Sequence, residues 1–213
     1  MEYTKNFPNK IYHATTFEHF ESIEKRILIH RKDANINLDF GKGFYTTTNI
    51  SQAVKRAESL QRRLQNPRTR AVKEEHRGIV IAFDLNIELL YHNLGTDSYK
   101  IFDDADAKWA EFIVDNRTQN KHRIFKHNYD WSYGPMADGN CTFICKEYKR
   151  RDDLTQAQLL NGYFDEERGE EVKGLSPYRD DYDQLVFHNE ELANCGVLTN
   201  PIYEKVRQNF HAR

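Results

Sequence analysis

Runs of apolar residues divide the chain into short strands separated by helical segments. The most apolar run is Gly78 to Leu85, and because nearly every position in it is hydrophobic, it is expected to be a central strand of a sheet. Lys10 to Thr15 and Asp183 to His188 are predicted as two further strands, one toward each end of the chain. A fold that contains both strands and helices is therefore expected.

Helical periodicity follows the first strand and recurs further along. Between Phe17 and Ile27 apolar residues are spaced by three and four positions, which predicts a helix that Thr16 can cap. A second helix is expected from Asn49 or Ser51 to about Leu64. Its apolar face is predicted to consist of Ile50, Ala53, Val54, Ala57, Leu60 and Leu64.

The second half of the chain has weaker patterns. Ala105 to Arg117 is predicted as a helix, and the aromatic stretch Tyr129 to Pro135 as a strand that Gly-Pro ends. Cys141 to Tyr148 is expected to be another strand or a mixed segment, and Leu154 to Leu160 a helix. The acidic stretch Tyr163 to Tyr182 has few apolar anchors, so a mobile surface loop is expected there.

Size and composition set the class of protein. A chain of 213 residues with 38% hydrophobic and 30% charged residues suits one globular domain, expected to span residues 1–213. There is no run of about 18 apolar residues and no apolar segment behind the first lysine, so neither a membrane span nor a signal peptide is expected. The three cysteines form no CxxC pair, which favours reduced thiols in the cytoplasm.

The stretch Phe40-Gly-Lys-Gly-Phe-Tyr-Thr-Thr-Thr48 is the strongest candidate for a functional motif. Two glycines bracket Lys42 and lead into Phe44, Tyr45 and β-branched threonines, which predicts a turn opening into a strand. Such a turn can bring its backbone and one aromatic ring close to a ligand. Taken alone, the pattern also fits an ordinary turn before a half-buried strand.

Together with three other blocks, this motif resembles the ADP-ribosyltransferase superfamily. The similarity is to its histidine-tyrosine-glutamate branch, which includes the poly-ADP-ribose polymerases and diphtheria-type toxins, and more closely to a bacterial, toxin-like family with an Asp-Gln third motif. The matching blocks are residues 12–15, 39–53, 109–117 and 183–188. The resemblance implies an α+β fold with two packed, mainly antiparallel sheets, flanking helices and a cleft for NAD.

The same resemblance implies a set of NAD-binding residues. His13 is expected to hydrogen-bond the adenosine-side ribose, and the backbone of Ala14, where many relatives have glycine, to hold the nicotinamide carboxamide. Tyr45 is expected to contact the nicotinamide. Arg56 stands where relatives usually carry a second aromatic residue against that ring. The further contributors implied are Thr15, Gly43 and Thr46.

The third motif places Gln184 where the branch has its glutamate. Glutamine forms hydrogen bonds but carries no charge and takes up no proton, whereas glycosyl transfer passes through an oxocarbenium-like state. Three interpretations follow: Gln184 orients NAD without a strong base, Asp183 or Glu111 supplies the carboxylate, or the domain binds NAD without transferring. Orientation by Gln184 with an acid nearby is the preferred one.

The function implied is mono-ADP-ribosyl transfer from NAD, as substrate, to a macromolecular acceptor, either protein or nucleic acid. The setting would be that of a bacterial toxin or a phage-defence effector, with a neutralising antitoxin protein as a partner by analogy. One alternative is a non-catalytic module that binds NAD or ADP-ribose.

The second alternative is a nucleic-acid-binding protein that uses the basic stretch 55–77. The net charge of −2 gives no global attraction for nucleic acid. No metal is expected, since there is no HExxH and no convincing second pair of ligands beside Cys141 and Cys145. A Cys-His nucleophile pair is a lesser possibility.

Overall fold

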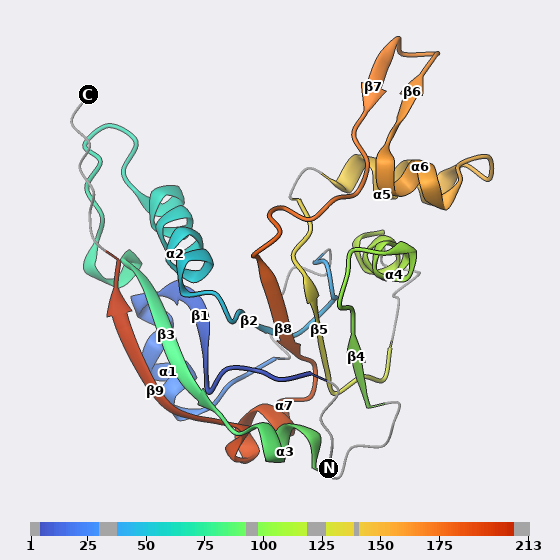
Figure 1. Cartoon of the computed structure of the whole chain (residues 1–213). Helices are drawn as coiled ribbons and strands as arrows, with labels where there is room; N and C mark the ends of the chain where they lie inside the picture. The colour runs from blue at the N-terminus through green and yellow to red at the C-terminus, as the bar shows by residue number, and fades with distance from the viewer. Residues whose placement is uncertain (1–4, 30–37, 93–97, 119–126, 139–140, 207–213) are drawn as a thin grey trace. The chain divides into compact units, whose positions relative to one another are not determined.

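The computed structural model describes residues 5–29, 38–92, 98–118, 127–138 and 141–206, and it has the α+β architecture that the sequence predicts. The chain forms two compact units (Figure 1). The first unit combines Met1–Leu28, Tyr45–Asn93 and Glu190–Arg213, and the second combines Ile29–Phe44 and Leu94–Asn189. Within the described residues, none of the helices has the length and apolar character needed to cross a membrane.

The first unit is built on a three-stranded antiparallel sheet in the order β1-β3-β9 (Figure 1). Its strands are β1 (Lys10–Thr16), β3 (Gly78–Leu85) and β9 (Leu198–Lys205). The prediction that Gly78 to Leu85 is a central strand is confirmed, because β3 pairs on both edges and most of its side chains are buried. Its register with β1 pairs His13 with Ile81.

Helix α2 (Ile50–Leu64) packs on this sheet, and its buried face differs from the one predicted. Ala53 and Ala57 are buried, but Ile50 and Leu64 are exposed, and Gln61 is buried in their stead. Gln61 is accommodated because its side-chain oxygen accepts a hydrogen bond of 3.0 Å from the backbone N–H of Gly78. Small side chains let the helix approach closely: a Cβ on Gly78 would lie 2.3 Å from the Ala57 carbonyl oxygen.

The helix predicted after Thr16 is shorter than expected. A 3-10 turn, η1 (Phe17–His19), leads into α1 (Phe20–Lys25), which ends before Ile27. The Thr16 hydroxyl donates to the Glu18 carboxylate, and its side chain makes no capping hydrogen bond. The remaining elements of this unit are η2 (Glu74–His76), α3 (Ile87–Tyr91), α7 (Glu190–Leu192) and η4 (Ala193–Val197).

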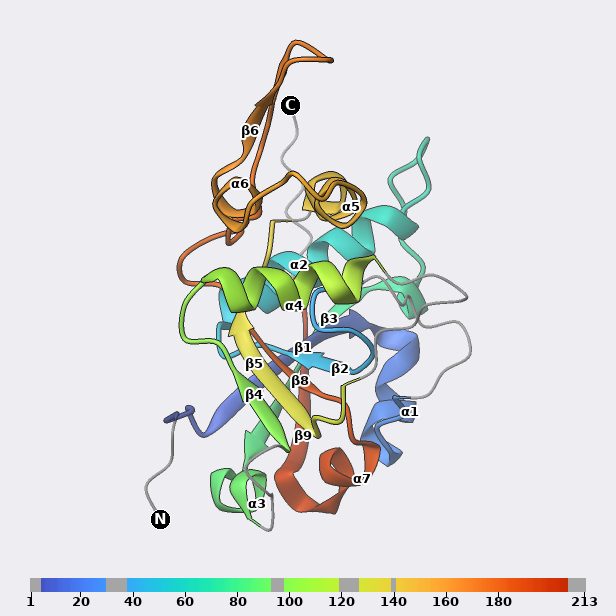
Figure 2. The ribbon, with the colours of Figure 1, turned by 90° about the vertical axis from the view of Figure 1, so that its right-hand side faces the viewer.

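The second unit contains strands β4 (Tyr99–Ile101), β5 (Trp131–Pro135) and β8 (Asp183–Phe187). β5 pairs antiparallel with β8 and parallel with β4, so this sheet is mixed. Helix α4 (Ala107–Arg117) crosses the C-terminal end of β5 (Figure 2), where the Trp109 indole N–H donates to the Pro135 carbonyl at 3.0 Å. In the short strand β2 (Phe44–Thr46), Phe44 belongs to the second unit, and Tyr45 and Thr46 belong to the first.

Two predictions for the second unit are wrong. Residues 141–148 form a helix, α5 (Thr142–Arg150), because Ile144 and Cys145 bury one helical face while charged residues occupy the other. The acidic stretch also has structure, since β6 (Tyr163–Asp165) and β7 (Glu170–Val172) pair as a hairpin. The predicted helix at 154–160 is confirmed as α6 (Gln156–Asn161), which begins with a capping box.

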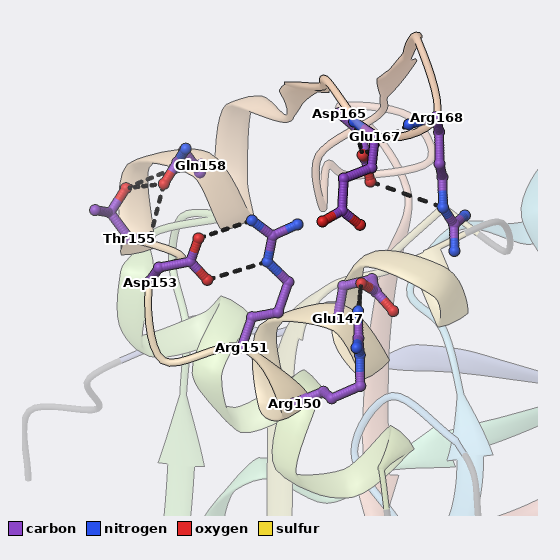
Figure 3. Close-up of polar contacts among 9 residues, drawn as sticks. All are labelled: Glu147, Arg150, Arg151, Asp153, Thr155, Gln158, Asp165, Glu167 and Arg168. Atoms are coloured by element: carbon purple, nitrogen blue, oxygen red, sulfur yellow. Dashed lines mark hydrogen bonds and ion pairs between the residues drawn. The ribbon is translucent and has the colours of Figure 1, made fainter.

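Local side-chain bonds explain the order of the acidic hairpin (Figure 3). The buried Asp165 carboxylate accepts hydrogen bonds from the backbone N–H groups of Glu167 and Arg168, which closes the turn. Gly169 completes the turn with φ of +67°, a conformation that favours glycine. The Arg168 guanidinium lies 4.5 Å from the centre of the Phe143 ring on α5. These bonds replace the apolar anchors that the sequence lacks.

Candidate functional site

The first motif and the end of the second motif, from Tyr45 onward, lie side by side in the first unit. Tyr12 on β1 and Thr47, just after β2, exchange backbone hydrogen bonds of 2.8 and 2.9 Å as an antiparallel bridge. His13 strengthens this link, because its Nδ1 lies 2.7 Å from the carbonyl oxygen of Tyr45. The strand that carries His13 is therefore joined directly to the strand that carries Tyr45, although 32 positions separate them in the chain.

The environment of His13 fixes its protonation. Burial lowers the pKa of His13 to about 4, with His19 and Arg56 contributing in the same direction, although the hydrogen bond to the Tyr45 carbonyl acts against them. The imidazole is therefore neutral at pH 7. Because a carbonyl oxygen only accepts hydrogen bonds, Nδ1 carries the proton and donates it to Tyr45. Nε2 is then the acceptor nitrogen of the ring.

The backbone polar groups of Ala14, for which a contact with NAD is predicted, face away from β3. In a strand, the N–H and C=O groups of residues two apart point to the same side. Since those of Tyr12 bond to Thr47, those of Ala14 are also directed away from β3. Ala14 packs with Tyr12 against a buried cluster of Ala53, Ala57, Val80 and Val206.

The other predicted NAD-binding residues differ in exposure. Thr15 and Thr46 are buried, whereas Tyr45 is half-buried. Arg56 projects from α2, where burial and then the nearby Arg63 lower its pKa. Arg56 also affects the His13 imidazole electrostatically, so these two side chains share one region of the first unit.

The glycine turn is held in the second unit by β8. A Cβ on Gly43 would lie 2.4 Å from Cγ1 of Val186 and 2.8 Å from the Phe187 carbonyl oxygen. The His188 imidazole lies 2.7 Å from the Lys42 carbonyl through Nδ1 and 2.8 Å from the Ser132 hydroxyl through Nε2. Burial and then the adjacent His127 lower the pKa of His188 to about 3, so it is neutral. Gly43 is therefore required by packing, and His188 holds the turn.

Gln184 is buried on β8 beside a charged pair that the sequence did not reveal. Its side-chain N–H₂ donates to Oδ2 of Asp39 at 3.3 Å and to the Pro135 carbonyl at 3.4 Å. Asp39 in turn forms an ion pair with Arg117, whose Nε and Nη2 lie 2.6 and 2.5 Å from Oδ1. Both residues belong to motif blocks of the sequence, but 78 positions separate them.

The two acids proposed from the sequence are placed differently. Asp183 precedes Gln184 on the same strand, so its side chain points to the opposite face, where its Oδ2 accepts a hydrogen bond of 3.1 Å from the Tyr133 hydroxyl. Burial and then this carboxylate raise the pKa of Tyr133. Glu111 lies on the face of α4 away from the buried tryptophan and accepts a hydrogen bond from Gln156. The carboxylate that contacts Gln184 is that of Asp39.

The basic stretch 55–77 is partly neutralised by neighbouring acids. Arg77 pairs with Glu74 at 2.8 Å, Lys73 lies 3.6 Å from Glu75, and Arg62 lies 3.9 Å from Glu58. Such exposed pairs reduce the field available to attract a polyanion. In the part of the chain that the structure describes, no group of three or more His, Cys, Asp or Glu side chains is arranged to hold a metal ion.

Comparison with known families matches residues 9–196 to the family described as "Protein of unknown function (DUF3990)". The matched range contains both polar centres, the one around the half-buried His13 and the one around the buried Asp39. No curated protein and no solved structure matches the chain.

Proposed function

The chain belongs to the DUF3990 family, and we propose that it is a mono-ADP-ribosyltransferase that moves ADP-ribose from NAD to a macromolecular acceptor. It would act as a bacterial toxin or phage-defence effector, with an antitoxin protein as its partner in the first case. The observation that carries the proposal is the neutral His13, fixed through Nδ1 to the carbonyl of Tyr45. A neutral imidazole held in one tautomer is suited to accept a hydrogen bond from a ribose hydroxyl.

The role proposed for the first unit is to bind NAD. Nε2 of His13 accepts from a hydroxyl of the adenosine-side ribose, and the backbone of Ala14 meets the carboxamide of nicotinamide. The half-buried ring of Tyr45 offers an aromatic face to the nicotinamide. Because Nδ1 of His13 holds the strand of Tyr45, the two ligand contacts depend on each other.

The role proposed for Gln184 is to orient the reacting ribose. The bond between nicotinamide and C1′ breaks, nicotinamide leaves as a neutral molecule, and a nucleophile of the acceptor bonds to C1′ and loses its proton. A hydrogen bond that the 2′-hydroxyl group donates to Gln184 would stabilise the oxocarbenium-like state between these events. Poly-ADP-ribose formation is not expected, since chain extension in the branch relies on the glutamate that Gln184 replaces.

The acceptor class is tested by transfer of label. The purified protein is incubated with a cell lysate and NAD labelled on the adenylate phosphate, and the products are treated with protease or with nuclease. Label that resists protease but not nuclease assigns a nucleic-acid acceptor, and the reverse result assigns a protein acceptor. If no label enters macromolecules in a lysate of any bacterium tested, the proposal of transfer is wrong.

A second function is favoured by one observation, the bond of the Gln184 amide to Asp39. A glutamine tied to a buried carboxylate also suits a module that binds NAD without cleaving it. This alternative predicts NAD binding by calorimetry with no release of nicotinamide.

A further inference from the structure

Asp39 is the centre of a buried polar cluster in the second unit. It is 6% exposed, and it lies just before the glycine turn. Oδ1 accepts hydrogen bonds from the guanidinium of Arg117, while Oδ2 accepts from the backbone N–H of Ala137 at 3.1 Å and from the amide of Gln184. A buried carboxylate with this many donors has little freedom to rotate.

The surroundings of Gln184 settle which end of its amide faces Asp39. The two neighbouring atoms, Oδ2 of Asp39 and the Pro135 carbonyl oxygen, are both acceptors. Reversing the amide would place its oxygen against two other oxygens, one of them charged, in a site that is 5% exposed. The N–H₂ group therefore faces the cluster, and the carbonyl oxygen Oε1 is directed away from it.

The same geometry explains why glutamine occupies this position. A glutamate at 184 would place a second carboxylate within about 3 to 4 Å of Asp39, where two like charges strongly disfavour joint ionisation. Glutamine avoids this repulsion and adds a donor that the carboxylate can accept. Asp39 and Gln184 are thus complementary.

We infer that Asp39 is a positioning residue for the reaction: it fixes the Gln184 amide so that Oε1 is the atom that accepts a hydrogen bond from the ribose 2′-hydroxyl group of NAD. This inference rests on the function proposed above. Arg117 supports Asp39 by neutralising its charge in the buried site. Asp39 itself needs no contact with NAD in this role.

The test is an exchange of the two side-chain types. Asp39→Asn, Gln184→Glu and the double variant are compared with the wild type for release of nicotinamide from ring-labelled NAD, with and without lysate, as kcat and KM. Asp165→Asn is the matched control, because Asp165 is a buried carboxylate beside an arginine in the same unit but makes its bonds to the hairpin turn. Thermal unfolding is recorded for every variant.

Asp39→Asn is expected to lower kcat by on the order of 100-fold while KM changes less than about threefold, because an interaction made in the transition state is misplaced. Gln184→Glu should lose activity similarly. The double variant should be more active than Gln184→Glu, because an asparagine at 39 removes the like charge and can donate to a glutamate at 184. The recovery should be partial, because the Ala137 N–H then faces the asparagine N–H₂ group. Asp165→Asn should keep kcat near the wild-type value.

Failure of the proposed function can be distinguished from failure of the inference about Asp39. If the wild type releases no nicotinamide under any condition, the proposed function is overturned and this inference with it. If the wild type is active and Asp39→Asn retains the kcat of the Asp165→Asn control, the inference alone is overturned. Should Asp39→Asn not fold, the decision rests on the other two variants: a double variant that is no more active than Gln184→Glu overturns the inference.

Discussion

The polar centres around His13 and Asp39 are built in different ways. In the first unit, His13 is a single neutral side chain whose hydrogen bond goes to a backbone carbonyl. In the second unit, Asp39 is charged, and its partners come from side chains of two other elements and from the backbone at Ala137. The first centre requires an uncharged imidazole at His13, and the second requires the cation of Arg117 to compensate the carboxylate of Asp39. Different changes should therefore disrupt the two centres.

The largest effect is expected from breaking the charged centre. Arg117→Ala leaves Asp39 buried without its cation, and the free energy of unfolding should fall by roughly 3 to 5 kcal/mol. Urea unfolding followed by fluorescence measures this loss. A decrease below about 1 kcal/mol would mean that the pair contributes no more than a surface ion pair.

Acid should weaken both histidine-containing regions. The folded-state pKa values of about 4 for His13 and about 3 for His188 lie below the ordinary value near 6.5, so the unfolded chain takes up protons first as the pH falls. Stability is then fully present above about pH 6.5 and is lost toward pH 4. Each histidine should account for about 2 kcal/mol between pH 7.5 and 4.5.

The check is urea unfolding of the wild type, His13→Gln and His188→Gln at these two pH values. Each variant should show a smaller loss than the wild type, because it lacks one group that protonates on unfolding. Equal losses in all three proteins would show that neither imidazole is held neutral.

Substitution of His13 is expected to have a smaller effect, which is measured as a change in the free energy of NAD binding. His13→Ala should weaken NAD binding by roughly 1 to 3 kcal/mol, since one buried hydrogen bond is lost. Tyr45→Ala should abolish binding that calorimetry can detect, with circular dichroism unchanged. His76→Ala, a half-buried histidine on η2 of the same unit, serves as the control and should bind NAD as the wild type does. Unchanged affinity in Tyr45→Ala would refute the NAD site.

The smallest effect is expected where the same kind of ion pair lies at the surface. Arg26 pairs with Glu190 at 3.1 Å in the first unit, but the Arg26 side chain is 62% exposed, against 14% for Arg117. Arg26→Ala should therefore cost less than about 1 kcal/mol in the free energy of unfolding. A loss as large as that of Arg117→Ala would show that burial is not the cause of the difference.

The sequence predicted the regular elements well where one periodic pattern dominates. Strand β3, helix α4 and the start of α2 at Asn49 follow their apolar spacing and their caps. The sequence did not predict the structure where hydrogen bonds of polar side chains determine which residues are buried or ordered. The buried face of α2 includes Gln61 because of one hydrogen bond to Gly78, and the acidic hairpin is ordered by Asp165. Neither hydrogen bond produces a periodic pattern of residues in the sequence.

The residues of the candidate site also differ in whether the sequence alone could single them out. His13 and Gln184 were found because each belongs to a recognisable short block. Asp39 and Arg117 were not, although both lie within such blocks, because a pairing between residues 78 positions apart is created by the fold. An acid beside Gln184 was expected, but the two acids considered, Asp183 and Glu111, bond to Tyr133 and Gln156.

The most direct test of the central claim uses two samples of NAD, one labelled on the adenylate phosphate and one on the nicotinamide ring, incubated with the protein and a lysate. Transfer predicts that adenylate label enters macromolecules while an equal amount of nicotinamide label is released as the free base. Retention of both labels in intact NAD, in a sample where calorimetry detects NAD binding, would contradict transfer and leave a protein that only binds NAD.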